Sequence, residues 1–148
     1  MFTLKIRGQV VRLALFVLVK IIKNILAVYF NSLSLQQEII VMTNRNKQIL
    51  GKIKSIAKGT APSGTLMYLY GSRARGEAHK DSDWDILIVL PKNKLEQSDY
   101  DKVSYPLVEL GWILGEKINP IIYTKEEWDA NSITPFYDNV VRDGISLL

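Results

Sequence analysis

The chain has 148 residues, 47% of them apolar, which is enough for one domain with a hydrophobic core and too few for two of ordinary size. It has no cysteine and one histidine, which excludes disulfides, thiolate metal sites and multi-histidine metal sites, so a bound metal would need carboxylates. The net charge of +4 comes from residues 1–41, which have five basic side chains and one acidic one, because residues 42–148 carry 14 of each. Since residues 42–148 are neutral overall, we do not expect nucleic acid as a partner.

Residues 1–41 form an apolar, basic segment. Val10 to Phe30 is strongly apolar but contains Arg12, Lys20 and Lys23. Each charge near a bilayer centre costs about 2.5 to 3.5 kcal/mol, so we do not expect a clean transmembrane span. A cleavable signal peptide is not expected either, because lysines follow the apolar run where a small-residue cleavage site would stand.

Helical spacing gives this segment a polar stripe. At about 100° per residue, five polar residues of the first 23 share one narrow face, namely Lys5, Gln9, Arg12, Lys20 and Lys23. Such a stripe is typical of an interfacial membrane helix, and it also suits a helix that packs on a partner. The alternative is that translation starts at Met42, where MTNRNKQIL reads as an ordinary polar helix start. We expect a cytoplasmic protein whose only route to a membrane is residues 1–30.

Residues 42–148 alternate between helical and strand patterns. Asn44–Lys58 is an amphipathic helix, with Ile49, Ile53 and Ile56 at steps of 4 and 3. The later predicted elements, in chain order, are a strand at Thr65–Tyr70, a short helix beginning at Ser72, a strand at Asp83–Leu90, a helix from Ser98 to Gly115, a strand at Lys117–Tyr123, a short helix through Trp128 and a last helix at Ile133–Val141. This order predicts an α/β layer fold.

Local signals predict where some of these elements begin. Ser98 with Asp101, and Thr124 with Glu127, have the spacing of capping boxes, which begin helices. Pro120 has no N–H to donate to a neighbouring strand. The third strand is therefore predicted to lie at a sheet edge or to be bulged at that proline.

Two carboxylates stand at the start of the second predicted strand. Strand side chains alternate, so Asp83 and Asp85 point to the same face, about 6.5 to 7 Å apart along the backbone, while Trp84 points to the other. Two such oxygen ligands can converge on one Mg²⁺ ion. The alternative is that the strand start is exposed and the aspartates pair with nearby basic residues, Arg73, Arg75 or Lys80.

Just upstream, Gly71 and Ser72 stand where a strand ends and a helix begins. Backbone N–H groups at such a junction face an anion, and glycine allows a phosphate to approach closely. Ser72 can add a hydroxyl bond, and Arg73 and Arg75 can pair with further phosphate oxygens. A phosphate cradle and a metal pair together are what a metal-nucleoside triphosphate requires.

The stretch GSRARGEAHKDSDWDILIV resembles the signature of the DNA polymerase beta superfamily of nucleotidyltransferases, in its minimal nucleotidyltransferase branch. The resemblance is sharp over Leu69 to Leu90, fits in outline from about Asn44 to Gly144, and does not extend to residues 1–41. It implies a small mixed sheet flanked by helices, classed as α/β or α+β.

The resemblance also implies roles for single residues. Gly71 and Ser72 would bind the triphosphate, and Asp83 and Asp85 would hold two Mg²⁺ ions. The implied reaction is attack by an acceptor on the α-phosphate of a nucleoside triphosphate, with ATP favoured, which releases pyrophosphate. Two metal ions stabilise the attacking and the leaving oxygen in such a reaction.

The third acidic position departs from the family pattern. The family usually supplies another carboxylate from the next core strand, and the position that we align here is Asn119, with Glu116 as the nearest acid. Asparagine cannot take a proton from an acceptor hydroxyl at neutral pH, and loss of a general base costs about 10² to 10⁴ in rate. Reduced activity is therefore expected, unless the alignment is wrong by one or two positions and Asn119 is an ordinary strand residue.

The sequence leaves competing functions open. The first is an enzyme that moves AMP from ATP onto a protein or small molecule, and the resemblance implies a possible role as the antitoxin of a toxin-antitoxin pair, with a helical toxin as protein partner. The second is a catalytically weakened nucleotide-binding or partner-binding module, which Asn119 supports. An antibiotic-modifying nucleotidyltransferase would be expected to need a further substrate domain.

Overall fold

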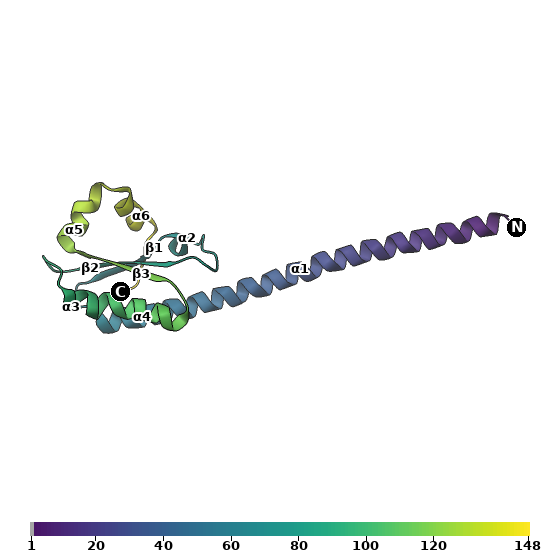
Figure 1. Cartoon of the computed structure of the whole chain (residues 1–148). Helices are drawn as coiled ribbons and strands as arrows, with labels where there is room; N and C mark the ends of the chain where they lie inside the picture. The colour runs from purple at the N-terminus through teal and green to yellow at the C-terminus, as the bar shows by residue number, and fades with distance from the viewer. Residues whose placement is uncertain (1) are drawn as a thin grey trace. The chain divides into compact units, whose positions relative to one another are not determined.

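The structure, a computed structural model, describes residues 2–148, with side chains for residues 17–37 and 40–148 (Figure 1). Its contacts divide the chain into two compact units, Met1–Arg45 and Asn46–Leu148. Helix α1 (Phe2–Thr60) contributes to both units. The expectation of a separate helix start at Asn44 is wrong, because α1 is continuous through that position; no proline precedes Pro62, and polar residues are tolerated within a helix.

The second unit is built on a four-stranded mixed sheet. In chain order the strands are β1 (Leu66–Tyr70), β2 (Trp84–Leu90), β3 (Ile118–Thr124) and β4 (Ile145–Ser146). Their order in the sheet is β3-β2-β1-β4, with β1 antiparallel to β2 and to β4, and β2 parallel to β3. The predicted α/β fold with a small mixed sheet is confirmed. Pro120 lies in edge strand β3, as its missing N–H requires, whereas two-residue β4 was not predicted.

Short helices connect the strands. They are α2 (Ser72–Arg75), α3 (Gln97–Asp99), the π-helical segment η1 (Tyr100–Ser104), α4 (Tyr105–Leu114), α5 (Lys125–Ala130), the 3₁₀ turn η2 (Asn131–Ile133) and α6 (Pro135–Asp143). The Thr124 capping box is confirmed, because its hydroxyl accepts from the N–H of Glu127 and the Glu127 carboxylate accepts from Thr124. The Ser98 box is wrong: the cap of α3 is Glu96, two residues earlier, and the Asp99 carboxylate accepts from the N–H of Glu96 at 2.9 Å.

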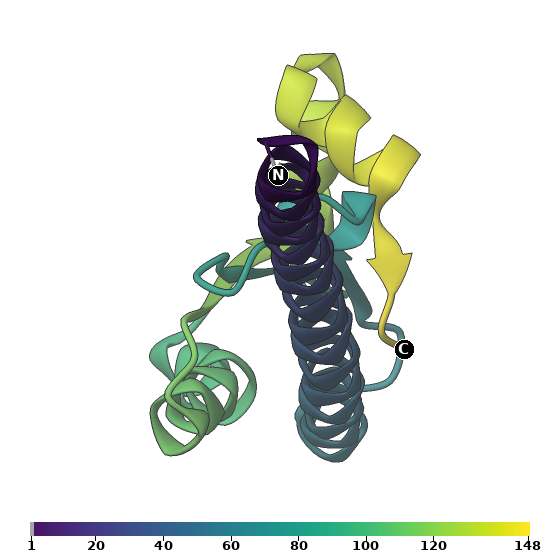
Figure 2. The same ribbon diagram turned by 90° about the vertical axis from the view of Figure 1, so that its right-hand side faces the viewer.

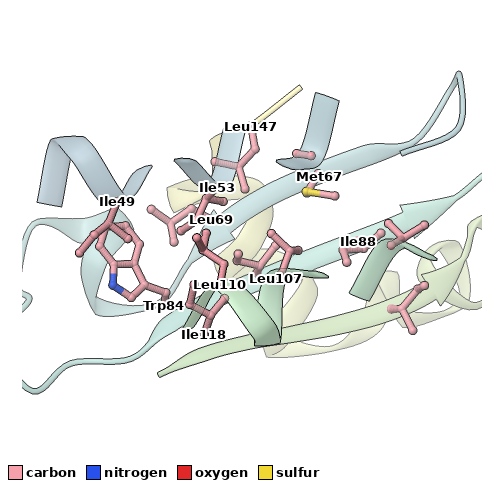
Figure 3. Close-up of a cluster of buried hydrophobic side chains, with 14 of the residues drawn as sticks. Ile49, Ile53, Met67, Leu69, Trp84, Ile88, Leu107, Leu110, Ile118 and Leu147 are labelled. Atoms are coloured by element: carbon pink, nitrogen blue, oxygen red, sulfur yellow. The ribbon is translucent and has the colours of Figure 1, made fainter. Parts of the chain in front are cut away.

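Helices cover both faces of the sheet (Figures 1 and 2). On one face, here called the α1/α4 face, the last turns of α1 and helix α4 pack on alternate residues of β1, β2 and β3. The buried side chains of this face include Ile53, Leu69, Ile86, Leu107 and Ile118. Figure 3 shows this core. The other face, the α5/α6 face, is smaller and buries Leu87, Val89, Trp128 and Val140. Strand β2 is therefore apolar on both sides after its first two residues, which explains its continuous run of buried positions.

Candidate functional site

The register of the sheet brings the predicted site residues together. In the antiparallel pair, Tyr70 at the end of β1 is opposite Asp85 near the start of β2, so Gly71 follows directly beside that carboxylate. In the parallel pair, Asn119 of β3 is opposite Asp85 from the other side. Paired residues project to the same face of a sheet. Residues far apart in sequence therefore meet at one end of β2, on the α5/α6 face.

Asp83, Asp85 and Asn119 form what we call the carboxylate cluster. Asp83 lies one residue before β2, and its Oδ2 accepts a hydrogen bond of 3.0 Å from Nδ2 of Asn119. Lys117 places its Nζ 3.9 Å from Oδ1 of Asp83, but its side chain is 80% exposed. The structure thus places Asn119, the residue aligned with the missing third acid, directly beside the aspartates.

The electrostatics of this cluster favour a cation. Burial raises the pKa of Asp85 and the negative charge of Asp83 raises it further, whereas the hydrogen bond from Asn119 and the charge of Arg73 oppose that rise. On the neighbouring strand, burial together with the charges of Asp85 and Tyr123 raises the pKa of Tyr70 to about 12. Both pKa shifts show that negative charge is unfavourable at this place, and a bound cation would offset that negative charge.

Gly71 brings the backbone between β1 and α2 close to the Asp85 carboxylate. Its backbone has φ 76° and ψ −157°, a combination that is essentially confined to glycine. A Cβ at this position would overlap Oδ2 of Asp85 and come within 3.3 Å of its Cγ. Only glycine therefore lets the chain pass so close to the carboxylate. Because α2 has only four residues, any anion held here would be bound by individual backbone N–H groups more than by a helix dipole.

Arg73, for which a phosphate-binding role is predicted, has several partners within the protein. Its Nε donates to the carbonyl oxygens of Ser82, at 3.0 Å, and Asp83, at 3.1 Å, and its Nη2 also donates to Ser82. Its Nη1 donates to Oδ1 of Asn46 at 3.1 Å. The side chain is only 4% exposed. Arg73 therefore fastens the backbone that carries Asp83, so it positions that carboxylate.

Arg73, Trp84 and Glu116 form a second group, the arginine cluster. The Cζ of Arg73 lies 4.2 Å from the centre of a Trp84 ring, and Oε2 of Glu116 lies 3.6 Å from the Arg73 guanidinium. The Trp84 Nε1–H donates to the same Glu116 oxygen at 3.2 Å. Burial lowers the pKa of Arg73. Among the charges that oppose this shift, the negative charge of Glu116 raises the pKa most strongly. Glu116 is thus held by groups of the α1/α4 face, apart from the carboxylate cluster.

The remaining predicted ligands lie closer to solvent. Arg75 is exposed and donates to Oε2 of Glu77 at 2.8 Å, and Ser72 begins α2 beside Gly71. Sequence reasoning did not single out Asn46 or Lys117. Lys117 stands two residues before Asn119 and could have been found from that spacing, whereas nothing in the sequence connects Asn46 with Arg73.

Comparison with known proteins gives a family match over the second unit. A family model described as the nucleotidyltransferase domain matches residues 46–142, which is more than half of the chain. This range contains the carboxylate cluster, the arginine cluster and the whole of β1 to β3. A comparison with curated protein sequences found no match.

The solved structures similar to this chain include two toxin-antitoxin structures and one nucleotidyltransferase. One is a crystal structure of a toxin-antitoxin with AMP-PNP, 22% identical, covering 67% of this chain and 72% of that chain, with a TM-score of 0.48. A mutant of the toxin-antitoxin MntA-HpeT is 20% identical over the same shares, with a TM-score of 0.47. A structure described as a minimal nucleotidyltransferase is 20% identical, covering 70% of this chain and 93% of that chain, with a TM-score of 0.45. The family assignment rests on the domain match alone.

Proposed function

The chain belongs to the nucleotidyltransferase domain family. We propose that it transfers a nucleoside monophosphate to a protein or small-molecule acceptor with the help of Mg²⁺, and that the favoured donor is ATP, which supplies AMP. The observation that carries the proposal is the approach of the Gly71 backbone to Asp85 beside Asp83. A phosphate bound by the backbone at Gly71 would lie next to a pair of carboxylates. A structural domain gains nothing evident from such a pair, because the charge of Asp83 adds to the cost of burying Asp85.

The residues present fit a divalent metal. Asp83 and Asp85 supply two carboxylates on one face, and the carbonyl oxygen of Asn119 is a further oxygen donor beside them. Among residues 17–37 and 40–148, no group of three or more His, Cys, Asp or Glu side chains gathers to hold a metal. Mg²⁺ commonly takes one or two carboxylates and completes its shell with phosphate oxygens and water. When bound, it would neutralise charge on the phosphates and polarise them towards attack.

The chain's own groups then bind and orient the substrate. The first N–H groups of α2, directly after Gly71, would donate to the triphosphate, and Ser72 would add a hydroxyl donor. Arg75 is exposed and can exchange its pairing with Glu77 for a phosphate oxygen. Asn119 orients Asp83 but cannot accept a proton, so the acceptor hydroxyl must lose its proton to another base.

The acceptor that we favour is a side chain on a protein partner. Support comes from the position of the carboxylate cluster beside edge strand β3, where Asn119 and Ile121 are exposed, so that a bulky acceptor can reach it. A toxin in a toxin-antitoxin pair is one such partner. The alternative function is a nucleotide-binding or partner-binding module, and the observation that favours it is the neutral Asn119 in place of a base.

Label transfer from α-labelled ATP distinguishes these functions. The full chain is incubated with labelled ATP, Mg²⁺ and a lysate of the source cell, beside Asp83→Asn, Asp85→Asn and the control Asp81→Asn, which removes one exposed carboxylate from the nearby loop. We expect transfer to fall by about 10² or more in the first two variants, as when a transition-state stabilising group is lost, and to persist in the control. Absence of transfer by every version, with a partner that co-purifies with all of them, would support the binding module instead.

A further inference from the structure

Residues 17–35 of α1 expose a long apolar surface. Their exposed apolar side chains, 43 to 73% accessible, include Val17, Leu18, Val19, Ile21, Ile22, Ile25, Leu26, Val28, Tyr29, Phe30, Leu33 and Leu35. Among the described residues, α1 is the one helix long and apolar enough, by length and composition alone, to cross a membrane. None of its most apolar stretch is buried. An apolar surface of this size in water indicates an interaction site.

The polar residues of this segment share one side of the helix. At about 100° per residue, five of them fall within a sector about 100° wide, namely Lys20, Lys23, Asn24, Asn31 and Ser34. Ile22, Ile25 and Tyr29 lie near the middle of the opposite side. Within residues 17–35, Ser32 is the one polar residue outside the polar sector. The segment is therefore amphipathic, with an apolar side much wider than its polar side.

This shape fits a lipid surface better than a helical partner. A coiled-coil seam needs only a narrow apolar stripe, whereas here the apolar side takes up most of the circumference. Charge points to the kind of lipid: residues 1–37 contain five basic side chains and no acidic one, which complements anionic headgroups. A spanning orientation would place Lys20 and Lys23 in hydrocarbon, at about 2.5 to 3.5 kcal/mol each near the bilayer centre.

We propose that residues 17–35 lie along the surface of a membrane that contains anionic lipids. Lys20 and Lys23 face the headgroups, and the side of the helix that carries Ile22, Ile25 and Tyr29 enters the acyl boundary. This placement is independent of the transfer reaction proposed above. Its consequence is that the nucleotidyltransferase domain would work close to a membrane.

Vesicle flotation of the full chain tests the proposal. The vesicles are phosphatidylcholine alone, or phosphatidylcholine with phosphatidylglycerol, each at low and at high salt. Two variants add the same charge to opposite sides of the helix: Ile25→Lys on the apolar side and the matched control Asn31→Lys on the polar side. We expect wild type to float with anionic vesicles. Ile25→Lys should bind these vesicles at least about tenfold more weakly, and Asn31→Lys should bind them as well as wild type or better.

A third variant removes the cations. Lys20→Ala with Lys23→Ala should weaken binding to anionic vesicles and reduce its salt dependence. Equal helical circular dichroism and an equal melting temperature would show that all variants fold. The proposal is overturned if wild type floats with neither vesicle, if Ile25→Lys and Asn31→Lys float alike, or if the bound chain resists extraction by alkaline carbonate, as a spanning helix does. Self-association in lipid-free sedimentation without flotation would overturn it in favour of a helical partner.

Discussion

Two groups of charged side chains flank the start of β2, and they differ in what balances their charge. In the arginine cluster, Arg73 has carbonyl, ring and carboxylate partners within the protein and is 4% exposed. In the carboxylate cluster, Asp83 has a neutral amide and a distant, exposed lysine, and burial with a like charge raises the pKa of Asp85. The charges of the first cluster are paired within the protein, whereas a bound cation would stabilise the second. The presence of a charged residue in a sequence motif therefore does not by itself show whether that residue is available to bind a ligand.

The largest effect is expected from a methyl group that displaces a carboxylate. Gly71→Ala places a Cβ on the Asp85 carboxylate and forces a backbone conformation that alanine avoids. A displacement of about 1 Å can cost about 10²-fold in rate, so we expect transfer to fall by that order. Enzymatic transfer and Mg²⁺-dependent nucleotide binding are the measurements.

The matched control for that change is Gly76→Ala. Gly76 has the same φ of 76°, but no atom lies within 4 Å of its Cβ position. Its cost should be about 1 to 2 kcal/mol of folding free energy, with transfer preserved in the folded fraction. Equal loss of transfer in both variants would show that backbone strain, and not the approach to Asp85, is responsible.

Removing the centre of the arginine cluster should destabilise the fold. Arg73→Ala removes the buried guanidinium beside Glu116 and the donors to the carbonyl oxygens of residues 82 and 83, at a cost of about 3 kcal/mol in unfolding free energy. Denaturant unfolding measures this loss. The control Arg75→Ala, two residues away on α2, should have little effect because its ion pair is exposed. If the two variants are equally stable and only Arg73→Ala loses triphosphate binding, Arg73 is the phosphate ligand that the motif predicts.

Adding a base should strengthen the carboxylate cluster. Asn119→Asp restores an acid beside Asp83, and if proton removal limits the reaction we expect transfer to rise by about tenfold or more. The metal-free protein should lose stability at the same time, since three carboxylates would repel one another. Single-turnover rates and thermal unfolding with and without Mg²⁺ measure the two effects. An unchanged rate, with Asn119→Ala equally active, would remove this position from the chemistry.

The smallest effect concerns the field that the carboxylate cluster exerts on Tyr70. The folded chain keeps the Tyr70 proton up to about pH 12, whereas the unfolded chain releases it near 10. The resulting stability is complete below pH 10 and is lost as the pH rises to 12. Relative to Tyr70→Phe, wild type should lose unfolding free energy over this interval. Asp85→Asn should lower the phenol pKa only in part, because burial is the larger cause; ultraviolet titration that returns it fully to 10 would assign the shift to Asp85 alone.

Much of the fold followed from local patterns. The spacing of Ile49 and Ile53 predicted the buried side of the last turns of α1, and Thr124 with Glu127 predicted the start of α5. The misses have physical causes. Strand β4 has two residues and no periodicity to detect, and α3 is capped by Asp99, whose carboxylate is also held by Lys92 from outside the helix.

The part of the site whose residues lie close together in the sequence was predictable. Gly71, Asp83 and Asp85 stand out because a strand with two acids beside a glycine junction has few structural explanations. The role of Arg73 was not predictable, because its acceptors are carbonyl oxygens of a loop that folds back on it and carry no sequence signal. The contact between Asn46 and Arg73 spans 27 positions and leaves no pattern either.

By itself the sequence determined the order of β1 to β3 and of the main helices around them, the face that carries both aspartates and the amphipathic character of residues 17–35, because each depends on the regular periodicity of a helix or strand. The tertiary structure decided which charged residues stay available to a ligand. Strand register set Asn119 beside the aspartates, and the return of the loop at residues 82 and 83 gave Arg73 its partners, with Glu116 beside it. Those pairings depend on long-range packing, which no local pattern encodes.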